Sequence, residues 1–414
     1  MRVVVLGGGI VGVTTAYQLA RDGHEVTVVE RNPAVARETS FANAGLVAPG
    51  HAYAWSSPQA PMMLLRSLWR DDQALRFKLR PDPRLYSWSL LFLRQCTAER
   101  AAANTRRKHK LCRYSQQAFR TLLEETPLDY DGQGGGLLYL YRSQESFDRG
   151  AANTGILAEG GQAIEVIDRE RAVAIDPALA SVKERLAGAI FCPSDESGDS
   201  CKFTEALAAE SESRGVTMAL DTTILGLETD GDRVAAVATD KGRYEAEAFV
   251  LALGVMSPQM VRRLGVKLPI YPVKGYSATL PVGEGHVPPT LGGVDEDNLT
   301  AYAKLGDRLR ITATAEFAGY DTGHRPSDFA GMLAVGRDLF PEGADWSKPD
   351  YWACLRPMTP EGSPILGAAG RANLYLNVGH GHMGWTMACG TARITADLIA
   401  GRRPEHDLEG LTLD

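Results

Sequence analysis

The chain has 414 residues, of which 44% are hydrophobic and 23% are charged, and its formal net charge is −7. This length allows two domains of ordinary size, and the composition is typical of a soluble globular protein. The negative net charge, together with the lack of a basic block in the sequence, argues against a nucleic-acid-binding protein.

The cysteines and the apolar runs indicate the compartment of the protein and exclude some types of binding site. The six cysteines are scattered and form no C-x-x-C pair, which argues against a metal cluster and a disulfide framework and favours a reducing compartment. A strand-like run follows Met1 directly and leaves no room for a signal peptide, and no apolar run approaches the roughly 20 residues of a membrane span. We therefore expect a cytoplasmic protein that binds no metal and does not cross a membrane.

The first thirty residues have the pattern of a dinucleotide-binding unit. A short apolar run leads into Gly7, Gly9 and Gly12, which have the G-x-G-x-x-G spacing. The glycines of this motif allow a tight turn, close approach of the backbone to a pyrophosphate, and close packing of helix on strand. We predict that the following helix runs to about Asp22, with Gly23 just beyond its end.

A second strand, residues 26–29, ends at Glu30, which lies 18 positions after Gly12. A carboxylate at this place can accept hydrogen bonds from ribose hydroxyls, and its charge disfavours a 2′-phosphate. The unit does not distinguish NAD from FAD, because both present an adenosine diphosphate.

The rest of the chain mixes helices and strands. We predict that residues 57–127 are largely helical and that residues 203–214 form another helix. Short alternating runs within residues 216–250 are typical of β-hairpins. The last predicted helix has one apolar face and ends at Gly401; that face contains Met387, Thr391, Ile394 and Leu398. Further strands are predicted within residues 133–141, 164–167, 248–254, 270–280, 308–317 and 373–378.

Six further motifs are spread over the chain: ETSFANAGLVAPG, PSDESGD, VLALG, YPVKGYS, LRPMTPEGSPILG and GHGHMGWTMACG. Together with the dinucleotide unit, they resemble the D-amino acid dehydrogenases, flavoproteins of the D-amino acid oxidase and glycine oxidase superfamily. LRPMTPEG and GWTMACG point to the dehydrogenase branch rather than to the oxidases. The sequence departs from that branch at His382, where its members carry a small polar residue.

The resemblance implies an α/β fold in which a Rossmann-like FAD-binding domain carries an inserted α+β substrate-binding domain with a mixed antiparallel sheet and helices. We expect the FAD-binding domain to comprise residues 1–56, 186–268 and 355–414. The substrate-binding domain would then comprise residues 57–185 and 269–354.

The resemblance also implies an enzyme that holds FAD non-covalently and oxidises a D-amino acid by hydride transfer from Cα to flavin N5. The imino acid would be hydrolysed to a 2-oxo acid, and the electrons would pass to a quinone or another respiratory acceptor. D-Proline and cis-4-hydroxy-D-proline are candidate substrates. Three alternatives stay open: a glycine- or sarcosine-type oxidase that uses oxygen, an NAD-dependent dehydrogenase, and a protein that holds a flavin without turnover.

The same motifs indicate which residues lie along the cofactor. The small side chains of SFANAGL would let backbone N–H groups approach the flavin ring. The segment from Gly379 to Gly384 would turn the positive end of a helix towards the flavin edge that gains negative charge on reduction. The predicted cofactor-binding residues are Gly7, Gly9, Ile10, Val11, Gly12, Glu30, Arg31, Ser40, Asn43, Ala44, Gly45, Leu46, Gly254, Gly381, His382, Met383, Gly384, Trp385 and Thr386.

Five residues are expected to contact the substrate. Arg356 is expected to hold the substrate carboxylate with two parallel hydrogen bonds, the role that the family gives to the arginine of this motif. Tyr302 matches by position a tyrosine that helps to hold the carboxylate in glycine oxidases, and His382 falls where those enzymes place a polar substrate contact. His51 and Tyr276 are further candidates for lining the site. No general base is assigned, because hydride transfer needs none if the amine arrives neutral.

Residues 62–100 mix apolar and aromatic side chains with arginines. This composition suits contact with the inner face of the cell membrane, where a quinone would be held. The other interpretation is a set of helices that pack on the core and expose their arginines to water. We favour the packing interpretation and keep peripheral membrane contact as the alternative. The arginines are Arg66, Arg70, Arg76 and Arg94.

Overall fold

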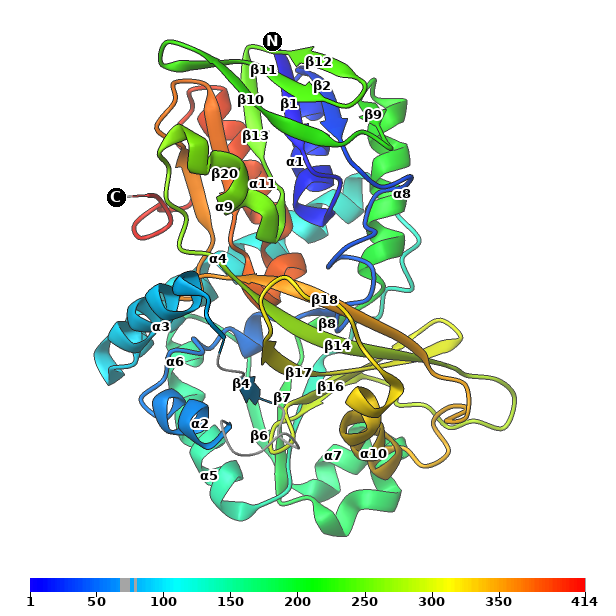
Figure 1. The fold of residues 1–414 in the computed structure, drawn as a ribbon. Helices are drawn as coiled ribbons and strands as arrows, with labels where there is room; N and C mark the ends of the chain where they lie inside the picture. Colours follow the sequence, from blue (N-terminus) through cyan, green and yellow to red (C-terminus); the bar gives the residue numbers. More distant parts are fainter. Residues whose placement is uncertain (68–74, 78–79, 414) are drawn as a thin grey trace.

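The computed structural model describes residues 1–67, 75–77 and 80–413. The chain forms two halves, each built on its own large β-sheet (Figure 1). The upper half in this view is an α/β unit with a largely parallel, Rossmann-like sheet, and the lower half is a mixed sheet with helices beside it. The predicted combination of a Rossmann-like unit with an α+β unit is therefore confirmed.

The upper sheet has six strands in the order β19-β20-β13-β1-β2-β9. All neighbours pair in parallel except β19, which is antiparallel to β20 at one edge. Val3 and Val5 of β1 pack with helices on one face, and Val4 and Leu6 pack on the other face. Burial on both faces explains the unbroken apolar run of β1. The strands are β1 (Arg2–Leu6), β2 (Glu25–Val29), β9 (Thr217–Ala219), β13 (Ala248–Leu251), β19 (Ile365–Ala368) and β20 (Leu374–Val378).

Helices α1, α8 and α11 lie on one side of this sheet, and a small antiparallel sheet of β10, β11 and β12 covers the other. Helix α11 is buried nearly all round rather than along one stripe. The reason is that α4 packs closely on it, so that a Cβ atom on Gly390 would lie 2.7 Å from the Cβ of Ser115. These elements are α1 (Ile10–Arg21), α4 (Ala98–Glu125), α8 (Ser200–Ser213), α11 (Gly384–Ile399), β10 (Ile224–Asp230), β11 (Arg233–Thr239) and β12 (Gly242–Glu245).

The region predicted to be largely helical contains α2 (Ala60–Ser67), α3 (Pro83–Gln95) and α4. It also contains a short strand that the sequence did not indicate, β4 (Leu75–Phe77), which pairs in parallel with β17. Arg70 lies outside the described residues.

The lower sheet has nine strands, eight of them in the order β18-β14-β17-β16-β15-β5-β7-β6, with β4 beside β17. Most neighbours are antiparallel, and β15 pairs in parallel with β5. The strands, apart from β4, are β5 (Leu137–Tyr141), β6 (Glu165–Ile167), β7 (Gly188–Cys192), β14 (Tyr271–Pro281), β15 (Gly292–Asp295), β16 (Thr300–Leu305), β17 (Arg308–Phe317) and β18 (Asp350–Met358).

The remaining elements connect or flank the two sheets. Strand β7 and the end of β18, which the predicted boundaries assign to the FAD-binding domain, pair within the lower sheet. The domain boundaries themselves stay a prediction. The elements are β3 (Leu46–Val47), β8 (Glu196–Ser197), α5 (Gln144–Asn153), α6 (Gly155–Glu159), α7 (Arg169–Ile175), α9 (Ser257–Val261) and α10 (Ala330–Leu339).

The turn between β1 and α1 leaves no room for side chains. Gly7 has a φ of +110°, and a Cβ atom there would lie 2.6 Å from the carbonyl oxygen of Ala252. A Cβ atom on Gly12 would lie 1.9 Å from the carbonyl oxygen of Gly7. Helix α1 can therefore rest on the end of β1 only because residue 12 has no side chain.

We expect Gly12→Ala to lower the melting temperature markedly or to prevent folding, because the backbone of residue 7 must move to admit the methyl group. Overpacking of this kind costs roughly 1–3 kcal/mol or more. The control is Gly331→Ala in α10, where a Cβ atom meets nothing within 4 Å and alanine favours the helix. Thermal unfolding followed by circular dichroism compares the two; equal melting temperatures would contradict the packing argument.

Candidate active site

A cavity of about 1510 Å³ lies between the two sheets. Gly7, Glu30, Leu253 and Val378 line it at the carboxyl ends of the adjacent parallel strands β1, β2, β13 and β20. This is where doubly wound sheets bind their ligands. Pockets for single small molecules are roughly 300–1,000 Å³, so this cavity has room for a dinucleotide and a substrate together. The opposite wall comes from β14, β17 and β18 of the lower sheet.

The first turn of α1 faces the cavity through Gly9, Ile10 and Val11. The Ile10 backbone N–H donates a hydrogen bond to Ser40 Oγ over 3.0 Å. A Cβ atom on Gly9 would find its nearest neighbour, the same Ser40 oxygen, at 3.5 Å, so the backbone there is open on the cavity side. Backbone N–H groups at the positive end of a helix suit a phosphate group.

Glu30 lies at the end of β2 and lines the cavity, with 9% of its surface exposed. Its carboxylate accepts hydrogen bonds from the Gly8 N–H at 2.7 Å and the Asn32 N–H at 2.9 Å, which fix its direction. The neighbouring Arg31 also lines the cavity and forms an ion pair with Glu38. Gly12 is absent from the described cavity lining, and the structure gives it the helix–strand contact described above; its role in binding the cofactor stays a prediction.

The segment from Ser40 to Leu46 passes along the cavity wall. Asn43 Oδ1 accepts a hydrogen bond from the Gly45 N–H at 2.9 Å, which folds the chain into a tight turn. Gly45 has a φ of +72°, and a Cβ atom there would lie 2.7 Å from the carbonyl oxygen of Gly198. The predicted residues of this segment that line the cavity are Ser40, Asn43, Ala44, Gly45 and Leu46, and Gly254 lines it from the end of β13.

The GHGHMGW segment joins β20 to α11 and turns the N-terminus of α11 towards the cavity. His380 is buried, which lowers its pKa to about 3, and its Nε2 lies 3.1 Å from Thr391 Oγ1. All the predicted residues of this segment line the cavity: Gly381, His382, Met383, Gly384, Trp385 and Thr386.

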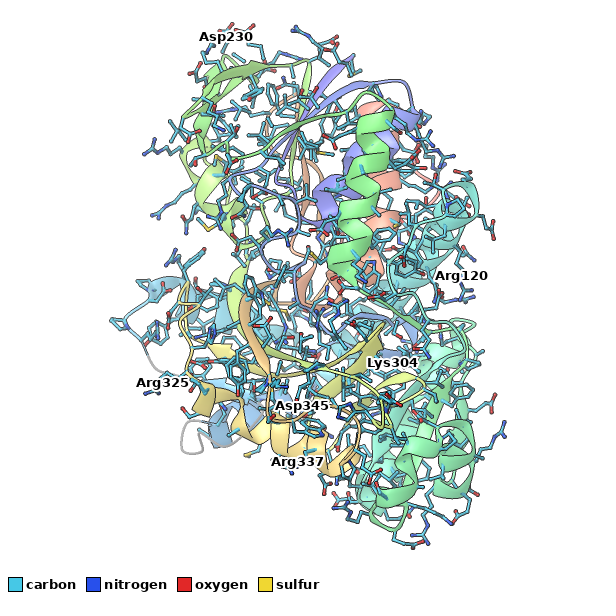
Figure 2. All side chains as sticks on the ribbon, turned by 90° about the vertical axis from the view of Figure 1, so that its right-hand side faces the viewer. Arg120, Asp230, Lys304, Arg325, Arg337 and Asp345 are labelled. Carbon is cyan, nitrogen blue, oxygen red and sulfur yellow. The ribbon has the colours of Figure 1, made fainter. Side chains whose placement is uncertain are left out.

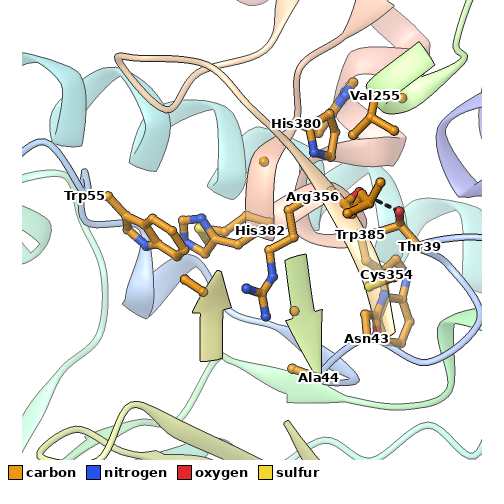
Figure 3. A pocket seen from close by; sticks show the side chains of 18 of the residues that line it. Thr39, Asn43, Ala44, Trp55, Val255, Cys354, Arg356, His380, His382 and Trp385 are labelled. Carbon is orange, nitrogen blue, oxygen red and sulfur yellow. Dashed lines mark hydrogen bonds between the residues drawn. The ribbon is translucent and has the colours of Figure 1, made fainter. Parts of the chain in front are cut away.

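His382 stacks on Trp55, with ring centroids 4.6 Å apart (Figure 3). Burial holds its pKa well below the usual value, and the charges of Lys108, His51 and Arg356 lower it further. Its Nε2 is buried, with no hydrogen-bond partner in the described part of the chain. His382 therefore presents a neutral imidazole within the cavity.

Arg356, on β18, reaches into the same cavity (Figure 3). Its Nη1 donates a hydrogen bond to the Thr314 carbonyl oxygen over 2.8 Å, and its guanidinium lies over Gly275, where a Cβ atom would be 2.4 Å from Nη2. Among the described residues, no carboxylate is paired with this guanidinium, and Cys354 is the one ionisable neighbour that affects its pKa. Burial lowers the pKa of Arg356, but a guanidinium stays charged in proteins. A desolvated cation without a counter-ion favours binding of an anion.

His51 and Glu296 face the cavity together, with His51 Nε2 2.8 Å from Glu296 Oε1. Burial opposes the charged form of His51, but the charge and hydrogen bond of Glu296 outweigh it and raise the pKa of His51. Behind this pair lies Asp195, which accepts hydrogen bonds from the Tyr139 hydroxyl at 2.7 Å and from the Gly50 N–H at 3.1 Å.

The two predicted tyrosines differ in position. Tyr276 lines the cavity, and its hydroxyl donates to Glu316 Oε2 over 2.6 Å. Tyr302 is fully buried on the other face of β16, where its ring packs against Phe340 at 4.8 Å. Side chains alternate along a strand, and Ala301 is the residue of β16 that faces the cavity. The expectation that Tyr302 touches the substrate is therefore wrong for this geometry.

Sequence reasoning missed Trp55 and Glu296, which line the cavity. Trp55 continues the small-residue segment by only a few positions, and its aromatic ring was a usable signal. Glu296 stands among other acidic residues in VDEDN, and nothing there separates it from a solvent-exposed turn.

Within the described ranges, no group of three His, Cys, Asp or Glu side chains could hold a metal ion. The described helices include none that is long and apolar enough to span a membrane.

Strand ends and open helix N-termini that meet at one cavity are typical of a dinucleotide-binding protein. The family model described as "FAD dependent oxidoreductase" matches residues 2–398, and the chain belongs to this family. The choice between NAD and FAD, which the glycine motif left open, is thereby decided for FAD. The size of the cavity and the open backbone at Gly9 fit that cofactor.

Named relatives are similar over the whole chain. A D-amino acid dehydrogenase 2 of Mesorhizobium japonicum is 50% identical over 412 residues, covering 99% of both chains. A D-amino acid dehydrogenase of Bradyrhizobium diazoefficiens is 42% identical over 414 residues, covering 100% of this chain and 98% of the other. Among solved structures, the glycine oxidase from Geobacillus kaustophilus is similar in fold, with a TM-score of 0.75, 23% identity, and coverage of 100% of this chain and 98% of that one.

The burial of Asp195 predicts that the stability of the protein depends on pH. Burial raises the pKa of Asp195 to about 7, whereas an aspartate in the unfolded chain has a pKa of about 3.9. Between these values the folded protein binds more protons than the unfolded chain, so ionisation of Asp195 lowers stability as the pH rises. Three pH units correspond to an upper bound of about 4 kcal/mol.

We therefore expect the melting temperature of Asp195→Asn, relative to wild type, to increase between pH 5 and pH 8, because the amide cannot ionise. Differential scanning fluorimetry at both values measures this. Asp148→Asn on the exposed surface of α5 is the matched control and should show no such change. A constant offset between Asp195→Asn and wild type at both pH values would contradict the role of burial.

Proposed function

We propose that the chain oxidises a D-amino acid with the help of FAD and passes the electrons to a quinone-type acceptor. The observation that carries this proposal is Arg356, a cation that faces the cavity and has no carboxylate partner among the described residues. Relatives called D-amino acid dehydrogenase that match nearly the whole chain at 42% and 50% identity support the choice of substrate class.

Arg356 would bind the substrate carboxylate. The hydrogen bond from Nη1 to the Thr314 carbonyl fixes the plane of the guanidinium, and other N–H groups are left to donate to a carboxylate. A substrate anchored at this end has its Cα held in one place, which lowers the entropic cost of reaching the reactive geometry.

FAD, when bound, supplies the two-electron acceptor for the hydride of the substrate Cα. The N-terminus of α11 faces the cavity, and its positive end would stabilise negative charge placed there. The Cα–N bond of the substrate becomes an imine, and water then converts the imino acid to a 2-oxo acid and ammonia, or opens the ring when the substrate is a cyclic amine. No side chain needs to act as general base if the amine binds in its neutral form.

The wall made by Trp55 and His382 supports a small ring as the substrate side chain. Two stacked flat rings present an apolar surface, and the neutral imidazole of His382 adds a polar group without charge. D-Proline and cis-4-hydroxy-D-proline have the size and shape for this wall, and we propose them as substrates.

We propose that the electron acceptor approaches the outer surface of α2 and α3. These two helices lie on the same side of the molecule in Figure 1. These helices line the cavity through Met63, Trp88 and Phe92, so an acceptor at this surface would be near the cofactor cavity. We propose that the surface meets the inner face of the cell membrane, where a quinone is available. The exposed large apolar side chains of α2 and α3 are Met62, Met63, Leu65, Tyr86, Leu90, Leu91 and Leu93.

Arg356→Ala should raise the KM for D-amino acids by roughly 10- to 150-fold, the loss of a charge-assisted hydrogen bond worth about 1.5–3 kcal/mol. Bound flavin, measured as the ratio of absorbance at 450 and 280 nm, should stay at the wild-type level. Arg337→Ala, on the outside of α10 (Figure 2), is the control and should keep a normal KM. A normal KM in Arg356→Ala would show that the carboxylate binds elsewhere.

The proposed acceptor predicts that the enzyme reduces quinones and forms little hydrogen peroxide in air. The variant Leu90→Ser/Leu93→Ser should still reduce a water-soluble quinone but should reduce a quinone embedded in anionic vesicles more slowly than wild type, because two apolar contacts are lost. Fast peroxide formation with slow quinone reduction would favour the oxidase alternative. If the wild-type enzyme and the variant reduced the embedded quinone at equal rates, the α2–α3 surface would be excluded as the membrane contact.

A further inference from the structure

The cavity carries an acid–base pair that the proposed steps do not use. His51 and Glu296 line the cavity, and their side chains are 29% and 17% exposed. Glu296 follows β15 and is fixed by a backbone hydrogen bond from its N–H to the Leu140 carbonyl oxygen over 2.9 Å. The lower sheet therefore holds this carboxylate at the cavity wall.

Glu296 has a free hydrogen-bonding position. Its Oε1 is paired with His51 Nε2 over 2.8 Å, and the described part of the structure shows no hydrogen bond to Oε2. A carboxylate can accept about four hydrogen bonds, so a donor on a ligand would find an acceptor here.

The orientation of His51 is fixed on its far side. Its ring stacks on Tyr139, with centroids 5.0 Å apart and planes within 10°, and the Tyr139 hydroxyl is bound to Asp195. His51 in turn holds Glu296, so the free oxygen is preorganised before a ligand arrives.

The surrounding charges favour a neutral donor. Glu296 is already paired with His51 and raises its pKa. The buried Lys108 lies near enough to lower the pKa of His51. Lys108 donates to the Tyr53 carbonyl, and Tyr53 also lines the cavity. A second cation would be repelled by His51 and Lys108, whereas a hydroxyl group adds no charge and can donate to Glu296.

This subsite and the proposed carboxylate site line the same cavity. His382 also lines it, and the charges of His51 and Arg356 both lower the pKa of His382. A small molecule held by its carboxylate at Arg356 can thus turn its side chain towards Glu296.

We infer that Glu296 determines specificity by accepting a hydrogen bond from a hydroxyl group on the substrate side chain, with His51 as its positioning residue. The inference rests on the proposed oxidation of D-amino acids. It names the preferred substrates as hydroxylated D-amino acids, because the analogue without the hydroxyl cannot donate a hydrogen bond to the second oxygen of this half-buried carboxylate.

The test compares kcat/KM for cis-4-hydroxy-D-proline and D-proline, and for D-threonine and D-2-aminobutyrate, with an artificial dye as acceptor. The wild-type enzyme should prefer the hydroxylated member of at least one pair by roughly tenfold or more. In Glu296→Leu this ratio should fall towards one. Glu145→Gln, an exposed carboxylate on α5, is the matched control and should keep the wild-type ratio.

Two further variants separate a specific role from a loss of folding. Glu296→Gln keeps a carbonyl oxygen as acceptor and should retain part of the preference. His51→Phe keeps the stacking on Tyr139 but loses the hydrogen bond to Glu296, and it should reduce the same ratio. Flavin content and melting temperature show whether each variant is folded.

The outcomes distinguish the inference from the proposed function. If no D-amino acid bleaches the flavin of the wild-type enzyme under anaerobic conditions, the proposed function itself is wrong. If D-amino acids do bleach it but the wild-type enzyme shows no preference for hydroxylated substrates, the inference is overturned. The inference is also overturned if Glu296→Gln and Glu296→Leu both keep the full wild-type preference. Where Glu296→Leu does not fold, the full wild-type preference in Glu296→Gln alone overturns it.

Discussion

The proposed chemistry depends on one cation, Arg356, that faces the cavity and has no carboxylate partner among the described residues. The guanidinium of Arg356 is oriented by the Thr314 carbonyl, and the described residues provide it with no carboxylate. Removing a charge from water is costly unless it is paired, and an anionic ligand would reduce that cost when it binds. We therefore propose that burial of this cation without a partner favours the binding of a carboxylate.

Each of the two sheets contributes one wall of the cavity. The parallel strands of the upper sheet end together and present backbone N–H groups and Glu30 to a dinucleotide, while β14, β17 and β18 of the lower sheet present Arg356 and Tyr276. Neither sheet forms the site alone. The glycines at positions 7 and 12 bring helix α1 onto its strand, and α11 adds a second helix N-terminus from the other end of the sequence.

Local patterns predicted the upper half well, because apolar runs and glycine spacing record burial on both faces and close backbone contacts. The segments predicted to lie along the flavin line one cavity, and their contact with the cofactor stays a prediction. Tyr302 shows the limit: a motif gives the strand, but the side of the sheet that each residue faces depends on pairing with β15 and β17. Strand β4 and the cavity position of Glu296 follow from tertiary contacts that leave no local periodicity.

The most direct test of the account is anaerobic reduction of the bound flavin by D-alanine and by D-alaninamide, which differ in the carboxylate. If the unpaired arginine anchors the substrate, D-alanine should bleach the flavin at concentrations where D-alaninamide leaves it oxidised. Bleaching by both compounds at the same concentrations and rates would contradict the central role of Arg356.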